Sequence, residues 1–269
     1  MKHAPRQQSA SVNIGGKDVN IKIDLGGGDS VGPIHLAGDE KMPKSAVTAK
    51  SQQDMLMNNG SLGTSFANPT HNVHRLGIRE GMLVADFGAG SGAYTLELAN
   101  LVGDSGKVYA VDVQRDLLTR IQNEAVKQGN ENVEIVWSDI ETVGGVGIRD
   151  GLLHAVLLSN TLFQVDDKIT VIKEAWRVLK PGGILAIIDW MDSYGGVGPQ
   201  KSNVVTQSEA TLLCTDNGFA FKNDFKAGEH HYGLLFVKMI QGQSDEEVLS
   251  AVKEKEKDFI TRTIEQELV

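Results

Sequence analysis

Three glycines alternate with other residues directly after an apolar run, and this spacing could hold a ligand against the backbone. The run covers residues 82–87, and the glycines are Gly88, Gly90 and Gly92. Without Cβ atoms, these positions let the chain turn sharply and let a ligand approach the backbone. The N–H groups that open the following helix would point at that ligand. The same spacing also satisfies the dinucleotide fingerprint, so it does not choose the ligand by itself.

A carboxylate stands where a nucleoside ligand would place its ribose. Asp112 ends the second apolar run, 20 residues after Gly92. A carboxylate at this point can accept hydrogen bonds from both ribose hydroxyls. The side chain could instead cap the helix that begins near Gln114. Asp112 therefore supports a nucleoside ligand without distinguishing one nucleoside from another.

The charge of Asp86 distinguishes between a dinucleotide ligand and a nucleoside ligand without phosphate. It lies two residues before the first glycine, at the end of the first apolar run. A carboxylate there would repel the pyrophosphate of a nicotinamide dinucleotide and attract an ammonium group. S-adenosylmethionine carries an ammonium and a sulfonium cation and has no phosphate. The electrostatics therefore favour S-adenosylmethionine over NAD.

Four segments at these positions resemble class I, Rossmann-like methyltransferases that depend on S-adenosylmethionine. Residues 84–92 look like their first motif, residues 111–112 resemble the second, and residues 138–140 resemble the motif after the third strand. Residues 179–183 are similar to the turn before their fifth strand. The resemblance covers residues 66–240 and is strongest to the small-molecule methyltransferase type 11 group, which includes quinone-biosynthesis enzymes.

The resemblance implies a set of cofactor contacts. Asp112 would bind the ribose, and Asp139 the adenine amino group, with the next backbone N–H at the ring. Asp139 could instead only close a turn, and so could Asn160, which follows the fourth strand. The cofactor-binding residues expected on this basis are Asp86, Gly88, Ala89, Gly90, Gly92, Asp112, Val113, Asp139, Ile140 and Asn160.

Residues past the fifth strand are the candidates for contact with the methyl acceptor. Asp189 and Trp190 are expected at the acceptor pocket, although Trp190 could simply be core. Methyl transfer is an in-line displacement, so the protein mainly aligns the reactants and excludes water. A base is needed only if the acceptor keeps its proton until it reacts. Candidates by position are Asp189, His154, His230 and His231, but His154 could cap a strand and the other histidines could be exposed on a hairpin. The catalytic residues stay unassigned.

Neither a metal site nor cysteine chemistry is expected. Cys214 is the sole cysteine in the sequence, which excludes an intrachain disulfide and a multi-cysteine zinc site. His71 and His74 are three residues apart and could share a helix face. Nothing near them in the sequence completes a set of metal ligands, so a polar helix surface is the favoured interpretation.

Apolar runs alternate with amphipathic helical segments between residues 82 and 240, which implies a parallel sheet covered on both faces. The last two runs, 219–225 and 232–240, have no room for a helix between them. They must pair as a hairpin, making one edge strand antiparallel. The predicted fold is therefore α/β: a Rossmann-like, doubly wound sheet of seven strands, mostly parallel, with a C-terminal antiparallel hairpin. The first five strands are expected at 82–87, 108–111, 133–137, 155–158 and 184–188.

The segments outside this methyltransferase domain, which is expected at 82–240, have other patterns. Residues 1–52 predict a flexible N-terminal arm with a β-hairpin, because apolar and polar residues alternate on both sides of two glycines. Residues 53–81 predict a helical lead-in that begins at an Asn-Pro pair. Residues 241–269 predict a C-terminal helix opened by a capping box, which could dock on the domain or form a homodimer.

The charge balance argues against polyanionic partners. The 269 residues include 26 basic and 35 acidic ones, for a formal net charge of -9, and they contain no cluster of Lys and Arg. No apolar run approaches the roughly 18 to 20 residues that span a bilayer, and the N-terminus lacks a secretory signal pattern. We expect a cytoplasmic protein that binds a small-molecule methyl acceptor and neither nucleic acid nor membrane.

Several functions are compatible with these features. The leading hypothesis is methyl transfer from S-adenosylmethionine to an oxygen, nitrogen or carbon of a small molecule. A methyltransferase of protein or RNA, recruited by the terminal segments, is the second. A protein that binds S-adenosylmethionine without catalysis is the third, and a nicotinamide dehydrogenase is more distant. The sequence does not identify the acceptor, the atom that is methylated or the oligomeric state.

Overall fold

The computed structural model describes residues 7–14, 17–24, 67–194 and 198–240, with seven single positions between 242 and 254. The chain divides into two compact units, Met1–Lys44 and Ser45–Val269. In the first unit, β1 (Gln7–Ile14) and β2 (Lys17–Asp24) pair antiparallel. This pairing is the hairpin that the alternating residues predict.

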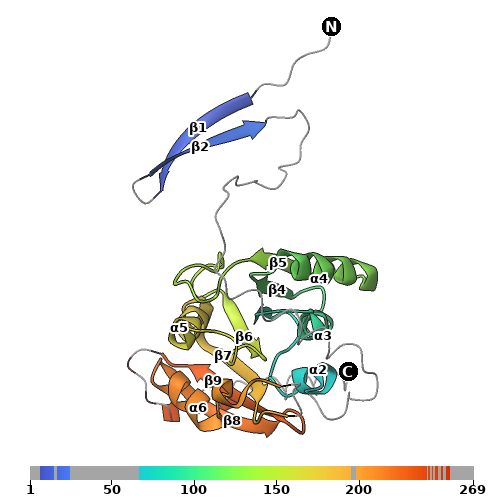
Figure 1. Cartoon of the computed structure of the whole chain (residues 1–269), viewed down its shortest axis with the longest axis vertical. Coiled ribbons are helices and arrows are strands. Elements are labelled where there is room, and N and C mark those ends of the chain that lie inside the picture. The colour runs from blue at the N-terminus through green and yellow to red at the C-terminus, as the bar shows by residue number, and fades with distance from the viewer. Residues whose placement is uncertain are drawn as a thin grey trace. The chain divides into compact units, whose positions relative to one another are not determined.

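A seven-stranded sheet forms the frame of the second unit, in the order β5-β4-β3-β6-β7-β9-β8 (Figure 1). The first five strands pair in parallel, and β9 runs antiparallel to both of its neighbours. The predicted fold class is confirmed. The strands are β3 (Leu83–Phe87), β4 (Lys107–Asp112), β5 (Val133–Trp137), β6 (Leu153–Ser159), β7 (Leu179–Trp190), β8 (Phe219–Lys226) and β9 (His231–Lys238).

The antiparallel strand is not at the edge of the sheet, where the sequence placed it. All eight residues of β9 are buried, whereas β8 has several exposed positions. The more apolar strand therefore lies between β7 and β8, and the more polar β8 forms the edge. Edge strands tolerate polar side chains because one side of the strand meets solvent.

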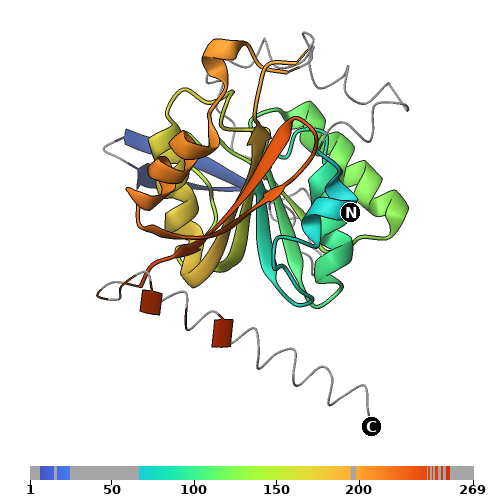
Figure 2. The same ribbon diagram turned by 90° about the horizontal axis from the view of Figure 1, so that it is seen from below.

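Helices cover both faces of the sheet (Figure 2). One face packs against α2 (Pro69–Val73), α3 (Ala93–Val102) and α4 (Arg115–Gln128), and the other against α5 (Lys168–Val178) and α6 (Gln207–Thr215). Each face has its own hydrophobic cluster. The predicted start at the Asn-Pro pair is confirmed, because the Asn68 side chain caps α2. Asp167 caps α5, and Thr206 caps α6 with a full capping box to Glu209.

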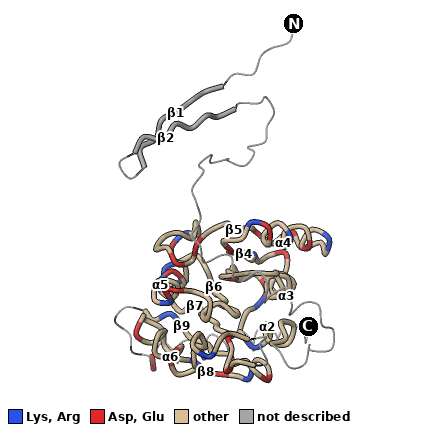
Figure 3. Tube along the Cα trace, in the orientation of Figure 1, with Lys and Arg blue, Asp and Glu red and all other residues tan. Residues whose placement is uncertain are grey.

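Acidic and basic residues are interspersed over the described part of the second unit (Figure 3). No helix among the described residues has both the length and the apolar character needed to cross a membrane. Of the predicted C-terminal helix, most residues lie outside the described part. Its capping box is present, because Ser244 N–H donates to the Glu247 carboxylate and Glu247 N–H donates to Ser244 Oγ.

The predicted turn at residues 179–183 lies inside β7. Leu179 pairs with Leu153 of β6, and the ladder resumes only where Ile184 pairs with Ala155. The intervening residues form an irregular bulge in which Gly182 has a φ of 73°. A left-handed backbone of this kind favours glycine. The strand therefore begins five residues earlier than predicted and contains the turn.

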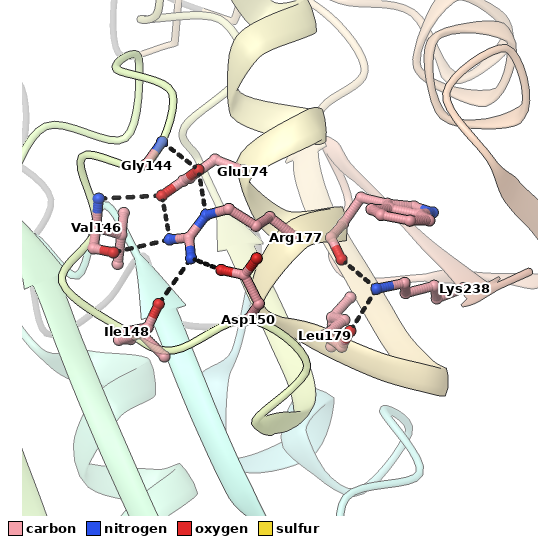
Figure 4. Close-up of polar contacts among 9 residues, drawn as sticks. Gly144, Val146, Ile148, Asp150, Glu174, Arg177, Leu179 and Lys238 are labelled. Atoms are coloured by element: carbon pink, nitrogen blue, oxygen red, sulfur yellow. Dashed lines mark hydrogen bonds and ion pairs between the residues drawn. The ribbon is translucent and has the colours of Figure 1, made fainter.

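Side chains from α5 hold the connection between β5 and β6, a stretch where the described residues contain no helix (Figure 4). The Glu174 carboxylate accepts the N–H groups of Gly144 at 2.9 Å and Val146 at 3.0 Å. Arg177 pairs with Glu174 and donates to the carbonyls of Val146 and Ile148, each at 2.8 Å. These bonds satisfy loop backbone groups that a helix would pair internally.

Lys238 closes the C-terminal end of α5. Its Nζ donates to the carbonyls of Trp176 at 2.7 Å and Leu179 at 2.6 Å (Figure 4). Carbonyls at a helix end lack intrahelical partners and carry partial negative charge, so a cation stabilises them. The lysine thereby connects β9 to the helix that holds the connection after β5.

We expect Glu174→Ala to lower the free energy of unfolding by about 2 to 4 kcal/mol, because it removes one partner of the half-buried Arg177 and leaves two loop N–H groups without their acceptor. Burial raises the pKa of Glu174, but hydrogen bonds from Arg177, Gly144 and Val146 outweigh it and lower the pKa overall. A carboxyl with a lowered pKa stabilises the fold above its unfolded value, near 4.5, and this contribution is lost as the pH falls below that value.

Urea unfolding at pH 7 and pH 3.5 measures both effects. Glu124→Ala is the control, because Glu124 lies on α4 and, among the described residues, hydrogen-bonds only to Lys127 and Gln128 of the same helix surface. Its loss should change stability by less than about 0.5 kcal/mol. Equal stability of Glu174→Ala and the parent protein at pH 7 would contradict the role assigned to this carboxylate.

Candidate functional site

The predicted site residues lie at the carboxyl ends of five neighbouring parallel strands, β3 to β7. Parallel strands bring these ends to the same edge of the sheet, so the structure gathers the residues there. The strand order reverses between β3 and β6, and ligands of open α/β sheets bind in the crevice at such a point. The residues gathered at this edge are Asp86, Gly88, Ala89, Gly90, Gly92, Asp112, Val113, Asp139, Ile140, Asn160, Asp189 and Trp190.

The turn between β3 and α3 is tightly packed. Gly88, Gly90 and Gly92 have φ values of 75°, 53° and 83°, in the left-handed region that favours glycine. A Cβ on Gly92 would lie 2.6 Å from Cγ1 of Ile121, and a Cβ on Gly88 would lie 2.8 Å from Oγ1 of Thr161. Two of the glycines are therefore required by the fold itself, before any ligand is considered.

Asp112 ties the end of β4 to the glycine turn. Its Oδ2 accepts the N–H of Gly90 at 2.9 Å, and its Oδ1 accepts the N–H of Gln114 at 2.8 Å. Burial raises the pKa of the carboxyl, and the same backbone hydrogen bonds oppose the rise. The bond to Oδ1 comes from Gln114, the N-cap residue of α4, and not from an N–H inside the helix, so the helix-capping role considered from sequence is not present. Because each carboxylate oxygen has a second lone pair, the side chain can still accept a ribose hydroxyl.

Asp86 is a buried carboxylate beneath the glycine turn. It is 1% exposed, and its Oδ2 accepts a hydrogen bond from Oγ1 of Thr95 at 2.7 Å. Burial raises its pKa to about 7, and the nearby charge of Asp112 adds to the rise. An acid in this setting gains from a cation, because the cation offsets the cost of desolvating its charge. The site thus fits a ligand that brings an ammonium group.

The end of β5 meets the end of β4. Ser138 N–H donates to the Asp112 carbonyl at 3.1 Å, and Trp137 Nε1 donates to the Val113 carbonyl at 3.0 Å. Asp139 accepts the N–H of Glu141 at 2.8 Å, which is the turn-closing role considered from sequence. The Ile140 side chain is buried. Contact of residues 139 and 140 with adenine stays a prediction.

Asn160 combines an unusual backbone conformation with a side-chain oxygen that lacks a protein partner among the described residues. It is the only non-glycine residue with positive φ, 53°, in the described part of the chain. Its backbone is held on both sides, since its N–H donates to Ile188 and its carbonyl accepts from Gln164 Nε2. Its Oδ1 is buried and has no protein hydrogen-bond partner among the described residues. Strained residues with an unsatisfied acceptor are typical of sites that meet a ligand.

Asp189 and Trp190, the predicted acceptor contacts, are buried at the carboxyl end of β7. Asp189 is 1% exposed and accepts the N–H groups of Trp190 at 2.8 Å and Leu162 at 2.9 Å. Burial raises its pKa to about 7, although backbone hydrogen bonds oppose the rise. Trp190 is buried and its ring lies 4.2 Å from that of His231. Asp189 thus anchors the loop after β6, and contact of either residue with the acceptor stays a prediction.

The three histidines considered as candidate bases lie in different surroundings. His154 lies at the start of β6, at the opposite edge of the sheet, where its Nδ1 accepts the Leu83 N–H at 3.0 Å. It is the strand cap considered from sequence and is too remote to act as the base. His230 is bonded to Asp192 at 3.0 Å. The interpretation of His231 as a surface residue is wrong, because it is 1% exposed, and burial lowers its pKa to about 4.

Sequence inspection missed several polar residues that support the site. Thr95 holds Asp86, and Tyr94 accepts a hydrogen bond from Nδ2 of Asn72 at 3.0 Å. Burial raises the pKa of Tyr94 to about 12. Thr161 donates to the Phe87 carbonyl at 3.1 Å and packs on the first glycine. Thr95 and Tyr94 follow the glycine turn directly, and that position was the one available signal.

The described residues contain no group of three or more His, Cys, Asp or Glu side chains placed to hold a metal ion. His71 and His74 both lie at α2, and Cys214 is buried in α6. Burial raises the pKa of the Cys214 thiol far above its usual range, so the thiol stays protonated. The cysteine is part of the hydrophobic cluster beneath α6.

Two curated relatives match part of this chain. An arsenite methyltransferase from Aquipseudomonas alcaligenes is 30% identical over 183 residues, which are 66% of this chain and 51% of that protein. The ubiquinone/menaquinone biosynthesis C-methyltransferase UbiE from Hahella chejuensis is 28% identical over 142 residues, covering 52% and 56%. The chain spans about half the length of these curated relatives.

A solved structure confirms the architecture. A SAM-dependent methyltransferase from Aquifex aeolicus is 28% identical with a TM-score of 0.62, and the match covers 70% of this chain and 97% of that one. Residues 49–194, more than half of the chain, match the ubiE/COQ5 methyltransferase family, and the chain belongs to that family.

Proposed function

We propose that this protein transfers a methyl group from S-adenosylmethionine to a small-molecule acceptor. The observation that carries the proposal is the pair of buried carboxylates at the glycine turn, Asp86 and Asp112. Two acids at this point oppose the phosphates of a dinucleotide and suit a ligand that has a ribose and positive charge. Membership of a methyltransferase family and the solved SAM-dependent relative support the same ligand.

Three residues at the sheet edge have assigned contacts with the cofactor in this proposal. Asp112 would accept the ribose hydroxyls, Asp86 would face the ammonium, and the buried Oδ1 of Asn160 would accept a hydrogen bond from the methionine half. When bound, the cofactor supplies a methyl group already activated by its sulfonium. The protein then orients cofactor and acceptor and keeps water out, which is the main requirement of in-line displacement.

An organic acceptor fits the chain better than arsenite does. Trivalent arsenic is a soft centre, and thiolates are the protein ligands suited to soft centres. Cys214 is the sole cysteine in the sequence and lies buried in α6 with its thiol protonated. The acceptor is therefore proposed to be an organic molecule, as the name of the relative in ubiquinone and menaquinone biosynthesis indicates for that protein.

A cavity of about 460 Å³ is the proposed acceptor site. Its volume lies within the usual range for small-molecule sites, roughly 300 to 1,000 Å³. Its lining includes Phe163, which is three residues after Asn160 in the sequence. Gln164, also in the lining, donates a hydrogen bond from Nε2 to the Asn160 carbonyl. The lining mixes apolar residues with polar and charged ones, which suits an acceptor that has an apolar body and several polar substituents. The apolar lining residues are Phe163, Val165, Val204, Val205 and Leu213.

Other features stay predictions from sequence. These are the boundaries of the four predicted segments, the cytoplasmic location, the homodimer through the C-terminal helix and the absence of nucleic-acid or membrane partners. The interspersed charges of the described residues agree with a small-molecule partner, because a polyanion site usually gathers Lys and Arg on one face (Figure 3).

Calorimetric titration of S-adenosylhomocysteine into Asp112→Ala tests the cofactor site. We expect about 10- to 100-fold weaker binding than in the parent protein, because hydrogen bonds from the ribose to a charged group are lost. Asp116→Ala, on an exposed acid in the first turn of α4, should bind normally. Thermal melting checks that both variants fold. Binding of NADH by the parent protein in place of S-adenosylhomocysteine would overturn the proposal.

Binding of S-adenosylhomocysteine should strengthen with pH. The pKa of Asp86 is raised to about 7, so the ligand-free carboxyl is mostly protonated at pH 6 and mostly ionised at pH 8. Because only the ionised form attracts the ligand's ammonium, we expect about tenfold tighter binding at pH 8 than at pH 6. The measurement is the dissociation constant across this range. The dependence should flatten in Asp86→Asn, and an unchanged slope in that variant would rule out Asp86 as its origin.

Filling the cavity should obstruct the acceptor without affecting the cofactor. Leu213→Trp places a larger side chain in the lining, whereas Leu212→Trp changes a neighbour that is 61% exposed. With an acceptor found by screening hydroquinones and phenols for uptake of labelled methyl groups, Leu213→Trp should lower kcat/KM at least about tenfold. Affinity for S-adenosylhomocysteine should be unchanged in both variants. Full activity of Leu213→Trp would exclude this cavity as the acceptor site.

A further inference from the structure

An exposed tryptophan lies beside the proposed nucleoside end of the site. Trp137 is the last residue of β5, the edge strand, and is 47% exposed. The guanidinium carbon of Arg115, the first residue of α4, lies 3.5 Å from the centre of its ring. The two side chains form a cation–π stack, in which the guanidinium restricts the orientation of the indole.

Only one of the two residues is unfavourable for its own element. Tryptophan suits a strand, although about half of Trp137 stays in water, whereas an arginine in the first turn of a helix opposes the positive end of the helix dipole. Residues that break local preferences are concentrated at functional sites. The stability of the helix and of the strand therefore does not explain the stack.

The indole of Trp137 also forms a hydrogen bond to the end of the neighbouring strand. Trp137 Nε1 donates to the Val113 carbonyl at 3.0 Å, and the next residue, Ser138, donates its N–H to the Asp112 carbonyl at 3.1 Å. Two successive residues of one strand end thus hold two successive carbonyls of the neighbouring strand end. The backbone around Asp112 is fixed from the side opposite the glycine turn.

The fixed backbone continues into the groups proposed to meet the cofactor. The Asp112 carboxylate reaches the other way, to the N–H of Gly90 at 2.9 Å. A continuous series of contacts therefore runs from Arg115 through Trp137 and Val113 to Asp112 and the glycine turn. If the indole N–H were absent, the carbonyl of Val113 would keep access to water, but the turn would lose one of the two hydrogen bonds that hold its carbonyls.

We propose that Trp137 and Arg115 are positioning residues for the nucleoside half of the cofactor. The indole N–H fixes the turn that carries Asp112 and Val113, and the guanidinium fixes the indole. This inference rests on the proposed function, since it concerns the same cofactor site. Because the carbonyl that the indole holds lies in an exposed region, water can replace the bond, and the fold itself depends little on it.

The test is calorimetric binding of two ligands to Trp137→Phe, which keeps an aromatic ring and removes the N–H. S-adenosylhomocysteine has both halves of the cofactor, and 5′-methylthioadenosine has the nucleoside half without the amino acid. We expect both ligands to bind about five- to tenfold more weakly, by the same factor, which corresponds to one lost hydrogen bond. The melting temperature should not change. Asp86→Asn should weaken S-adenosylhomocysteine alone.

Trp176→Phe is the matched control. Trp176 is 40% exposed and stacks with the Nζ of Lys238 at 3.7 Å, so it is also a cation-stacked surface tryptophan. It lies on α5, away from the ends of β4 and β5. Both ligands should bind this variant as they bind the parent protein.

Arg115→Ala is the second variant and covers the case in which Trp137→Phe does not fold. It keeps the indole N–H but removes the group that orients it, so it should weaken both ligands by an equal and smaller factor. Parent-like binding to Trp137→Phe, or unequal loss of the two ligands, would overturn the inference and leave the proposed function intact. Failure of the parent protein to bind S-adenosylhomocysteine would overturn both.

Discussion

Between β3 and β6 the chain changes the direction in which it adds strands to the sheet. From β3 it proceeds outward through β4 to β5, and it then returns to place β6 on the other side of β3. The turn after β3 therefore leads to α3 on one face, while the loop after β6 leads to α5 on the other. The two connections diverge and leave a crevice at the sheet edge. The predicted cofactor residues lie at the carboxyl ends of β3 and β6, which border this crevice, and of β4 and β5 beside β3.

Three buried carboxylates lie at or next to the ends of β3, β4 and β7, and their hydrogen bonds differ. Asp189 is enclosed by backbone N–H groups of its own strand and of the loop after β6, so it anchors that loop. Asp112 is shared between the glycine turn and the start of α4. Asp86 accepts from the Thr95 hydroxyl and is deeply desolvated. A carboxylate with fewer donors gains most from an incoming cation, which makes Asp86 the electrostatic centre of the proposed site.

The two flanks of the site depend on side-chain restraints at positions where regular structure is missing. Glu174 and Arg177 hold the connection between β5 and β6 from the face that carries α5. Trp137 and Arg115 restrain the turn after β4 from the opposite face. An irregular backbone can hold a ligand only if its conformation is specified elsewhere, because ordering a free loop on binding would reduce affinity. The proposed nucleoside end is therefore bordered by ordered turns.

The sequence by itself determined the strands, the helix caps, the family and the gathering of site residues at one sheet edge. These features follow from local periodicity and from the rule that parallel strands share an end, so they need no knowledge of contacts. Which residues lie close together across the sheet was decided only by the tertiary structure. The pairing of β7 with β9 buries His231 against Trp190, and the apolar character of β9 puts the antiparallel strand inside the sheet. The donors around Asp86, Asp112 and Asp189 likewise come from residues up to 27 positions away, and spacing along the chain does not reveal such contacts.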